Sequence, residues 1–406
     1  MDFLSEKPIG KPNLKQINRS NIYQAIYETP GISRQEIAGL LELSLPTVIG
    51  NIQDLMQEGL IKEIGYVGYT GGRNAKAYGI VERARVAIGL DLTRNHITAV
   101  AVDLRGQIVF KLRLRHPFAY EDAYFRKLGD VVQQLIKEGN LESDAVLGVG
   151  IGVPGLVTTD GDTVFYGEIL NFTGAARKEI AKYIEFPTML FNDAKAAAFA
   201  ETWRNKNMNN AFYIMLSNNV GGAVFLHNQV FHGDGRKCGE IGHITIVPDG
   251  KLCYCGQKGC MDPYCAATVL SDYTGGNLEK FFELLKNKDS EALKLWEEYL
   301  GHLSVTVNTV HTLFDCTIII GGYVGGYMED YLEDLRSMTA ERNPFEVDAD
   351  YLIVCQYKTE AIAAGAALNF VSQYLQKIWK RITRCRNADR MIFSFRQKPA
   401  VSVQET

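Results

Sequence analysis

One histidine and three cysteines lie close together in the second half of this 406-residue chain. His243 is followed by Cys253, Cys255 and Cys260, with two glycines between the last two cysteines. An imidazole and three thiolates fill the tetrahedral coordination sphere of Zn²⁺. A Cys-x-Cys…Cys cluster with an upstream histidine is typical of metal ligands and not of a hydrophobic core, so we expect a zinc site. Four protein ligands leave no open position, and the zinc is therefore predicted to be structural.

The composition describes a globular chain with no sign of membrane insertion. Hydrophobic residues make up 46% and charged residues 22% of the sequence, and the formal net charge is −4. We find no run of about eighteen apolar residues that would span a bilayer. Residues 1–13 lack the apolar segment of a signal peptide. Eight cysteines without a secretory signal indicate reduced thiols, so we expect a cytoplasmic protein.

Charge is distributed unevenly along the chain. Residues 1–80 hold eight basic and eight acidic side chains and are neutral. Residues 371–406 hold eight basic side chains against Asp389 and Glu405, a balance of +6. The middle of the chain is therefore about −10 by subtraction from the total. The basic tail over 376–406 is predicted to be a solvated end or, alternatively, a contact for phosphate.

Helix-start signals in the first 82 residues indicate a small domain that precedes the rest. A short helix is predicted over 22–28, ended by Pro30 and Gly31. Ser33 then begins a second helix, with Glu36 completing a capping box. Ser44 begins a third helix that extends to about residue 58, with proline in its first turn. Two helices around a tight turn predict a helix-turn-helix, whose second helix can enter the major groove of DNA.

The third helix has an apolar face and a face of small polar residues. Val48, Ile52, Leu55 and Met56 are expected to point inward, and Thr47, Gly50, Asn51 and Gln53 outward. Strands at 61–64 and 77–80 around a glycine-rich loop predict a wing with Arg73 near its tip. A plain helical adaptor is the alternative, but cations in a glycine-rich hairpin favour DNA. The candidate DNA contacts are Arg34, Ser44, Thr47, Asn51, Arg73 and Lys76.

From residue 84 onward the pattern becomes α/β and occurs twice. The first set has strands at 86–92, 97–103, 108–114, 146–153 and 188–191, with helices over 122–137 and from Asp193. The second has strands at 212–216, 223–226, 317–320 and 351–355, closed by a helix from about 360 to 381. Two similar lobes around a cleft are predicted. Asn192 and Asp193 follow a strand, where a carboxylate can bind a sugar hydroxyl, or alternatively only cap the helix.

These motifs together resemble the ROK family (repressor, open reading frame, kinase) from about residue 12 to residue 375. The resemblance rests on Gly152-Val153-Pro154-Gly155, Asn192-Asp193-Ala194, Glu240-Ile241-Gly242-His243 and the Cys253–Cys260 segment. It implies two actin-like, ribonuclease-H-like lobes, a zinc knuckle and a sugar cleft behind a winged helix-turn-helix. The sugar-binding positions it implies are Gly155, Asn171, Asn192, Asp193, Glu240, His243 and Asp262, the last standing where the family usually has glutamate.

The chain departs from the family's kinases at both phosphate-binding loops. Where kinases carry Asp-x-Gly-Gly-Thr, residues 91–95 read Asp-Leu-Thr-Arg-Asn, and side chains there would block close approach of a phosphate. The second loop, residues 217–222, reads Ser-Asn-Asn-Val-Gly-Gly instead of a Gly-Thr-Gly pattern. The resemblance is therefore to the transcriptional-repressor branch, with no catalytic residue. If a kinase activity existed, Asp193 would be its base.

Three functional hypotheses follow. The leading one is a sugar-responsive repressor that binds double-stranded operator DNA as a homodimer or homotetramer and takes a sugar or sugar phosphate in the cleft. The second is an ATP-dependent sugar kinase with an added DNA-binding head. In the third, the body senses a transport protein instead of a sugar. The predicted domains are 1–82 and 83–406, the latter with lobes at about 83–205 and 206–375 and the tail at 376–406.

Overall fold

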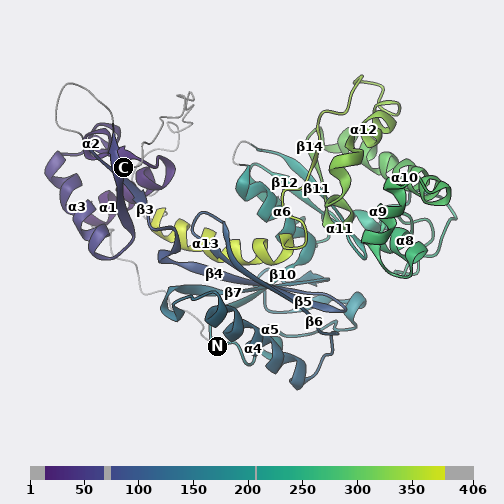
Figure 1. Cartoon of the computed structure of the whole chain (residues 1–406), viewed down its shortest axis with the longest axis horizontal. Helices are drawn as coiled ribbons and strands as arrows, with labels where there is room; N and C mark the ends of the chain where they lie inside the picture. The colour runs from purple at the N-terminus through teal and green to yellow at the C-terminus, as the bar shows by residue number, and fades with distance from the viewer. Residues whose placement is uncertain (1–13, 68–74, 206–207, 380–406) are drawn as a thin grey trace. The chain divides into compact units, whose positions relative to one another are not determined.

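The computed structural model describes residues 14–67, 75–205 and 208–379 (Figure 1). The chain divides into two compact units, one of Met1–Val81 with Leu375–Thr406 and the other of Glu82–Tyr374. The larger unit contains two five-stranded sheets, each with its own hydrophobic core. The α/β class, the two lobes and the winged helix-turn-helix that the sequence predicts are all present.

Within residues 14–67 and 75–81, the smaller unit has three helices and a three-stranded sheet. The capping box of Ser33 and Glu36 is formed, and the Ser44 side chain accepts a hydrogen bond from the Thr47 N–H. Each cap provides an acceptor for an N–H that the first helical turn leaves without a partner. The first helix begins at Leu14, eight residues before the predicted start. The elements are α1 (Leu14–Glu28), β1 (Ile32–Ser33), α2 (Arg34–Leu41), α3 (Leu45–Gln57), β2 (Ile61–Val67) and β3 (Ala75–Ile80), with sheet order β1-β3-β2.

The first lobe is built on a sheet whose strand order is β10-β7-β4-β5-β6. Neighbours among β4, β5 and β6 pair antiparallel, while β7 pairs parallel with both β4 and β10. The helix α4 covers one face, with Tyr124, Leu128 and Leu135 in the core. Its elements are β4 (Val86–Leu92), β5 (His96–Asp103), β6 (Ile108–Arg115), α4 (Asp122–Glu138), β7 (Val146–Val153), β8 (Leu156–Val157), β9 (Val164–Tyr166), α5 (Arg177–Ile180) and β10 (Thr188–Asn192).

The second lobe has the same topology, and its strand order β13-β12-β11-β14-β15 corresponds to β6-β5-β4-β7-β10 of the first lobe. Neighbours among β13, β12 and β11 pair antiparallel, while β14 pairs parallel with both β11 and β15. A long segment between β13 and α10 carries the metal-type cluster, and this segment has no counterpart in the first lobe. The elements are β11 (Ala211–Leu216), β12 (Val220–Leu226), β13 (Gln229–Phe231), α7 (Asp262–Cys265), α8 (Ala267–Ser271), α9 (Leu278–Lys286), α10 (Ser290–Phe314), β14 (Thr317–Gly321), α11 (Gly322–Gly325), α12 (Leu332–Ala340) and β15 (Leu352–Val354).

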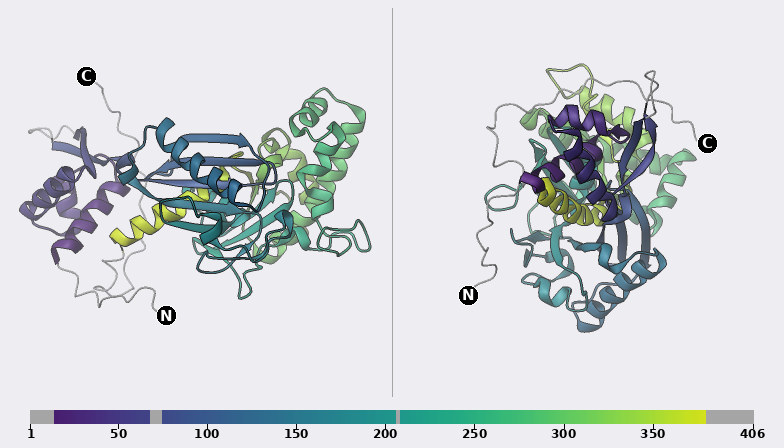
Figure 2. Two further views of the ribbon diagram at one scale, coloured as in Figure 1. Left: turned by 90° about the horizontal axis from the view of Figure 1, so that it is seen from below. Right: turned by 90° about the vertical axis from the view of Figure 1, so that its left-hand side faces the viewer.

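The two lobes exchange their last helices. The helix α6 (Asp193–Arg204) follows the first sheet in sequence but packs against β11 and β12 of the second sheet. The helix α13 (Ala361–Trp379) follows the second sheet but lies along the first one, as Figures 1 and 2 show. The prediction that the 360–381 helix closes the second lobe is therefore wrong.

Glycines explain why α13 packs on the first sheet. A Cβ added to Gly89 would lie 1.8 Å from the Ala363 carbonyl oxygen, and one on Gly150 would lie 2.2 Å from that of Ala366. Gly148 and Gly152 touch the same helix through Phe370 and Ile362. Because residues two apart in a strand share a face, the glycines of β7 form one smooth stripe. This stripe lets an alanine-rich helix approach the backbone of the sheet directly.

Candidate functional site

A cleft of about 470 Å³ lies between the two lobes. The parallel strands β4, β7 and β10 all end on its first-lobe side, as expected for ligand sites of α/β folds. On the other side lie the turn between β11 and β12 and part of the segment that follows β13. Of the predicted sugar-binding residues, five line this cleft: Gly155, Asn192, Asp193, Glu240 and His243.

Asn192 and Asp193 are held by the start of α6. The Asn192 side-chain oxygen accepts a hydrogen bond of 3.0 Å from the Lys195 N–H, and its amide donates to the Gly155 carbonyl oxygen at 3.0 Å. Asn192 is therefore an N-cap and also a lining residue of the cleft. The N-cap interpretation is confirmed, and sugar binding by Asn192 stays a prediction. The Asp193 carboxylate accepts a 2.7 Å hydrogen bond from the Ala194 N–H. This bond fixes the position of one carboxylate oxygen.

Two carboxyl groups on the first-lobe side of the cleft, those of Asp91 and Asp193, have raised pKa values. Burial, with a contribution from Glu240, raises the pKa of Asp193 to about 7. Burial, with repulsion from Asp193, raises the pKa of Asp91 to about 8. Asp91 is 2% exposed and sits one residue before the end of β4. A group that titrates near neutral pH can accept a proton or a hydrogen bond from a hydroxyl.

Glu240 faces this pair from the second lobe. Burial raises the pKa of its carboxyl group, and the nearby Lys195 ammonium opposes that shift. Lys195 is 6% exposed and donates a 2.7 Å hydrogen bond to the Arg236 carbonyl oxygen. The Arg236 guanidinium in turn donates to the Val157 carbonyl oxygen at 2.7 Å and to the Thr159 hydroxyl at 3.2 Å. The loop that carries Glu240 is thus tied to the hairpin of β8 and β9.

The four predicted metal ligands converge on one point. One donor atom from each of His243, Cys253, Cys255 and Cys260 can be chosen so that all four lie within 4.8 Å of one another. The Nδ1 atom of His243 lies 3.8 Å from the sulfur of Cys253, and the sulfurs of Cys255 and Cys260 are also 3.8 Å apart. Three thiol sulfurs and an imidazole nitrogen are the donor set that zinc prefers. The cluster therefore fits a closed metal site.

The other ring nitrogen of His243 points toward the cleft side of this cluster. Its Nε2 lies 3.1 Å from the hydroxyl of Tyr254, and both residues line the cleft. A metal on Nδ1 would fix the proton on Nε2, which makes that nitrogen a hydrogen-bond donor. Tyr254 was not among the predicted site residues. Its place between two metal-ligand cysteines was the signal that it would lie at the site.

Two predicted sugar-binding residues do not line the cleft. Asp262 is 6% exposed, and its carboxylate accepts a 2.7 Å hydrogen bond from the Val220 N–H. This bond holds the turn between β11 and β12, and a role of Asp262 in sugar binding stays a prediction. Asn171 is exposed and ends a short 3-10 helix with φ of 53°. Asparagine tolerates this left-handed conformation, which gives its presence a local reason.

In the loop after β4, two backbone N–H groups form hydrogen bonds within the loop itself. The Thr93 N–H donates to the His96 carbonyl oxygen at 3.0 Å, and the His96 N–H donates to the Thr93 hydroxyl at 3.1 Å. Arg94 reaches away from the turn and donates to the Ile169 carbonyl oxygen at 3.1 Å. These two N–H groups are not directed at an anion in the cleft.

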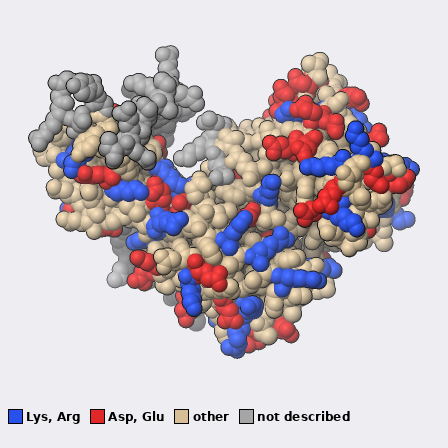
Figure 3. Space-filling model, in the orientation of Figure 1, with Lys and Arg blue, Asp and Glu red and all other residues tan. Residues whose placement is uncertain are grey.

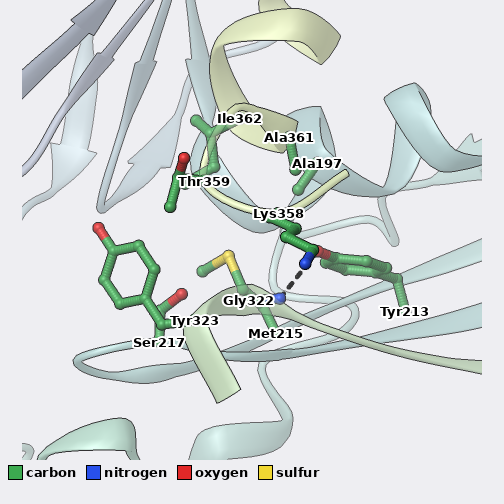
Figure 4. Close-up of a pocket in the computed structure, with 10 residues that line it drawn as sticks. All are labelled: Ala197, Tyr213, Met215, Ser217, Gly322, Tyr323, Lys358, Thr359, Ala361 and Ile362. Atoms are coloured by element: carbon green, nitrogen blue, oxygen red, sulfur yellow. Dashed lines mark hydrogen bonds between the residues drawn. The ribbon is translucent and has the colours of Figure 1, made fainter. Parts of the chain in front are cut away.

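The paired glycines of the second lobe are explained by packing within the protein. A Cβ on Gly222 would lie 2.7 Å from the Gly239 carbonyl oxygen, and one on Gly321 would lie 2.2 Å from the Tyr213 hydroxyl. The Gly322 N–H donates to that same hydroxyl at 3.2 Å (Figure 4). The cavity beside Gly322 has a volume of about 10 Å³, which is room for one water molecule. These glycines are therefore no sign of a nucleotide site.

In the smaller unit, the structure corrects the predicted faces of α3. Asn51 is 5% exposed, and its side-chain amide donates to the Thr47 carbonyl oxygen at 2.8 Å. Met56 is 36% exposed. The predictions that Asn51 points outward and Met56 inward are both wrong. At 100° per residue, position 51 lies about 40° from Leu55 and about 60° from Val48, at one edge of the buried face, and the structure buries Asn51 there.

The remaining candidate DNA contacts differ in their surroundings. Ser44, the N-cap of α3, and Gln53 within α3 are both exposed. Thr47 is half-buried, and its hydroxyl oxygen lies 2.8 Å from that of Ser44. Arg34 is half-buried, with its guanidinium 5.3 Å from the centre of the Tyr78 ring. Lys76 forms a 2.8 Å ion pair with Glu63, which raises its pKa. Arg73 lies outside the described residues. The sequence analysis placed Gln53 outward but did not select it as a contact.

Within residues 14–67 of this unit, basic side chains form ion pairs with acidic ones. Lys15 pairs with Asp54 at 3.1 Å, and Arg19 pairs with Glu58. On the face seen in Figure 3, basic and acidic side chains of this unit are interspersed. The helix α3 itself contains no lysine or arginine. Its exposed face is suited to base edges more than to phosphates.

No helix within residues 14–67, 75–205 and 208–379 combines the length and apolar character needed to cross a bilayer. This finding agrees with the absence of a long apolar run in the sequence.

Sequence comparison matches both parts of the chain to known families. Residues 87–372 match the sequence model of the ROK family, and residues 16–62 match that of a winged helix-turn-helix DNA-binding domain. The xylose repressor of Caldicellulosiruptor bescii is 27% identical over 261 residues, which cover 63% of this chain and 65% of the relative. The dual regulator NagC of Escherichia coli is 25% identical over 266 residues, 64% of this chain and 66% of the relative. The matched region thus spans just under two thirds of these relatives.

Structure comparison finds the same fold in a regulator and in a kinase. A ROK family transcriptional regulator, a homologue of the E. coli MLC protein, aligns with a TM-score of 0.69 at 22% identity, over 90% of this chain and 98% of the other. A ROK family glucokinase from Streptomyces griseus, in complex with glucose and AMPPNP, aligns with a TM-score of 0.56 at 22% identity, over 70% and 98%. At these identities the likeness shows the fold alone.

Proposed function

The chain belongs to the ROK family, and we propose that within it this protein is a sugar-responsive transcriptional repressor of carbohydrate-metabolism genes. The winged helix-turn-helix would bind operator DNA, and the cleft would bind the sugar. Relatives described as a xylose repressor and an N-acetylglucosamine repressor support this combination of roles.

The observation that carries the proposal is the convergence of Asn192, Asp193 and Glu240 on one cleft. They come from segments nearly fifty residues apart in sequence, yet all line the same 470 Å³ space together with His243. Amide and carboxyl groups of this kind form hydrogen bonds with several hydroxyls of a sugar at once. A ligand that bridges both lobes stabilises one lobe arrangement over the other, and this difference in affinity is what a regulator needs.

Zinc would have a structural role in this site. His243, Cys253, Cys255 and Cys260 would hold one ion per chain, and the ion would fix the fold of the segment that presents His243 and Glu240. We further propose a homodimer or homotetramer, because two winged heads can then bind two half-sites of an operator. Ligand binding would change the spacing of those heads.

The test of this function combines DNA binding with a sugar panel. Fluorescence anisotropy would measure binding of the purified full-length protein to promoter fragments, with and without xylose, glucose and N-acetylglucosamine. We expect one sugar to change operator affinity at least about tenfold, a coupling of 1.4 kcal/mol. If no promoter fragment binds more tightly than a shuffled sequence of equal length, the repressor assignment is wrong.

The surface of α3 provides a second test of the same proposal. Gln53→Ala removes an exposed amide able to contact an adenine edge, and we expect it to lower operator affinity by about 1–3 kcal/mol. Gln57→Ala, one turn further along the same helix at its exposed end, is the matched control. Equal effects of both substitutions would mean that α3 does not read bases through its centre.

A sugar kinase is the second candidate, favoured by one observation. Asp193 has a pKa raised to about 7, which suits a general base for a sugar hydroxyl. Phosphoryl transfer, however, depends on groups that position the phosphate and stabilise its charge. The Thr93 and His96 amides are engaged within their own turn, and the paired glycines are engaged in packing. Turnover with ATP, magnesium and the same sugars, abolished in Asp193→Asn, would establish the kinase and displace the repressor-only proposal.

A further inference from the structure

The charged side chains that line the cleft are predominantly acidic. Five carboxyl groups line it, and among the described lining residues only Arg94 is a lysine or arginine. Asp91 and Asp193 lie on the first-lobe side, where the parallel strands end, and Glu240 faces them from the second lobe. The complete set of lining carboxyls is Asp91, Glu168, Asp193, Glu240 and Asp272.

The nearby cations have roles within the protein. Arg94 donates a hydrogen bond to the Ile169 carbonyl oxygen at 3.1 Å. Lys195 is buried, and its ammonium donates a 2.7 Å hydrogen bond to the Arg236 carbonyl oxygen. Arg113, an exposed residue of β6, acts on Asp91 by lowering its pKa against the larger effect of burial. Neither Lys195 nor Arg113 lines the cleft.

The uncharged polar groups of the cleft suit hydroxyls. Ser217, Asn218 and Asn219 form one edge, and Asn192, Thr268 and Ser271 line other parts. Amide and hydroxyl side chains both donate and accept, as sugar hydroxyls do. From this lining we propose that the cleft selects an uncharged sugar and discriminates against the corresponding sugar phosphate. This inference rests on the proposed function and specifies its ligand class.

A phosphate group would meet an unfavourable environment at this site. A phosphate monoester carries a charge close to −2 at neutral pH, and it would lie among carboxylates in a partly buried space, where Coulomb repulsion is weakly screened. The turn at the end of β4 offers no compensation through its Thr93 and His96 amides, which already donate within the turn. A bound phosphate would therefore favour proton uptake by Asp193, whose pKa burial raises to about 7, and it would still face the carboxylates of Glu168, Glu240 and Asp272.

The experiment compares each sugar with its own phosphate. Isothermal titration calorimetry on the zinc-loaded full-length protein at pH 7.5 would use glucose against glucose 6-phosphate, and N-acetylglucosamine against its 6-phosphate. Xylose would be titrated as a further uncharged sugar. For the pair whose sugar binds most tightly, we expect the phosphate to bind at least about tenfold more weakly. A higher salt concentration should reduce this difference in affinity between the sugar and its phosphate, because added ions screen the repulsion between the phosphate and the carboxylates.

One charge-neutralising variant tests the cause. Asp272 is an exposed lining residue whose side chain has no role in the proposed metal cluster. Asp272→Asn should lower the ratio of the dissociation constant of the sugar phosphate to that of the parent sugar by roughly threefold or more, because one negative charge is removed from the cleft. Asp144→Asn is the matched control. Asp144 is exposed and precedes the start of β7, at the opposite end of that strand from the cleft, so its ratio should stay at the wild-type value.

The outcomes separate the inference from the function beneath it. A sugar phosphate that binds more tightly than its parent sugar overturns the inference and leaves the repressor proposal intact. Loss of that phosphate binding in Arg94→Gln would then identify Arg94 as its partner. An equal ratio in wild type and Asp272→Asn also counts against the inference. If none of the five compounds binds, the sugar-binding function itself fails and this inference with it.

Discussion

The two lobes of the body have the same strand order but hold their ligand-facing residues in different ways. In the first lobe, Asn192 and Asp193 stand at the junction of β10 and α6, so strand pairing with β7 and the helix N-cap fix them directly. In the second lobe, Glu240 and His243 lie in a segment with little regular structure between β13 and α7. That segment relies on the Cys-His cluster and on the Arg236 contacts.

This difference shows that a shared topology does not determine how a site is supported. One half of the cleft is held by strand pairing and a helix cap. The other half depends on a metal-type centre and on hydrogen bonds to the opposite lobe. A substitution that disturbs the packing of α6 and α13 should therefore affect both sides of the cleft. A substitution in the Cys-His cluster should affect only the second-lobe side. Substitutions in each half test that division.

Cys255→Ser should have the largest effect, because it removes one metal ligand from the second lobe. We expect loss of bound zinc and a destabilisation of about 3 kcal/mol or more, since binding energy of a structural metal is folding energy. Sugar binding should fall with it. Metal analysis by mass spectrometry and thermal unfolding would measure both effects.

Cys238→Ser is the control for this variant, because Cys238 lies in the same segment but outside the cluster. It should keep its zinc and its melting temperature. Wild-type protein purified without chelators that contains no zinc would remove the metal from this comparison altogether.

Gly365→Ala tests the scaffold that the two lobes share. A Cβ at this position of α13 would lie 1.7 Å from the carbonyl oxygen of Ala196 in α6, so the exchanged helices would be forced apart. Overpacking of this kind costs about 1–3 kcal/mol, and a clash with backbone belongs at the upper end. Urea denaturation would measure the change.

Gly301→Ala makes the same substitution in the interior of α10, where no atom lies within 4 Å of the added Cβ. It should stabilise the protein by up to about 1 kcal/mol, because alanine favours helix over glycine. A neutral Gly365→Ala would contradict the close packing of α13 on α6, and a destabilised Gly301→Ala would contradict the open space beside Gly301 in α10.

Asp193→Asn tests the first-lobe side of the cleft through pH. The folded-state pKa of about 7 exceeds the unfolded value of about 3.9, so the wild-type protein loses stability as pH rises from about 4 to about 7. The amide cannot ionise and avoids this loss. Asn at this position should therefore be more stable than wild type by up to about 4 kcal/mol at pH 8 and nearly equal at pH 4.

The same variant should weaken sugar binding while operator binding without sugar stays near the wild-type level. Chemical unfolding between pH 4 and pH 8 gives the stability difference, and Asp144→Asn serves as the exposed reference. A stability difference that does not change with pH would show that folding does not raise the pKa of Asp193.

Arg236→Ala should have the smallest effect, because it breaks only the contact between the Glu240 loop and the first lobe. Two hydrogen bonds from a half-buried guanidinium are lost, and we expect about 1 kcal/mol in stability and a few-fold loss in sugar affinity. Lys237→Ala, the exposed neighbour, should change neither quantity. If Arg236→Ala lowers stability without affecting sugar affinity, the contact does not position Glu240.

The sequence determined the features that depend on neighbours along the chain. Helix caps at Ser33, Ser44 and Asn192 could be predicted because a cap involves residues only two or three positions apart. The metal-type cluster was predicted for a similar reason, since three of its four members lie within eight residues of chain. The strands β4 and β7 were predicted to the residue because their buried runs are almost continuously apolar.

The tertiary structure decided which element packs on which and which side chains face the cleft. The exchange of α6 and α13 between lobes depends on contacts between residues more than 150 positions apart, such as Gly365 with Ala196. The glycine stripe of β7 and the alanines of α13 were visible in the sequence, but local patterns do not say which surfaces meet. Asp262 was assigned to the sugar from its type and motif, whereas its burial beneath Val220 follows from how the β11–β12 turn folds over it.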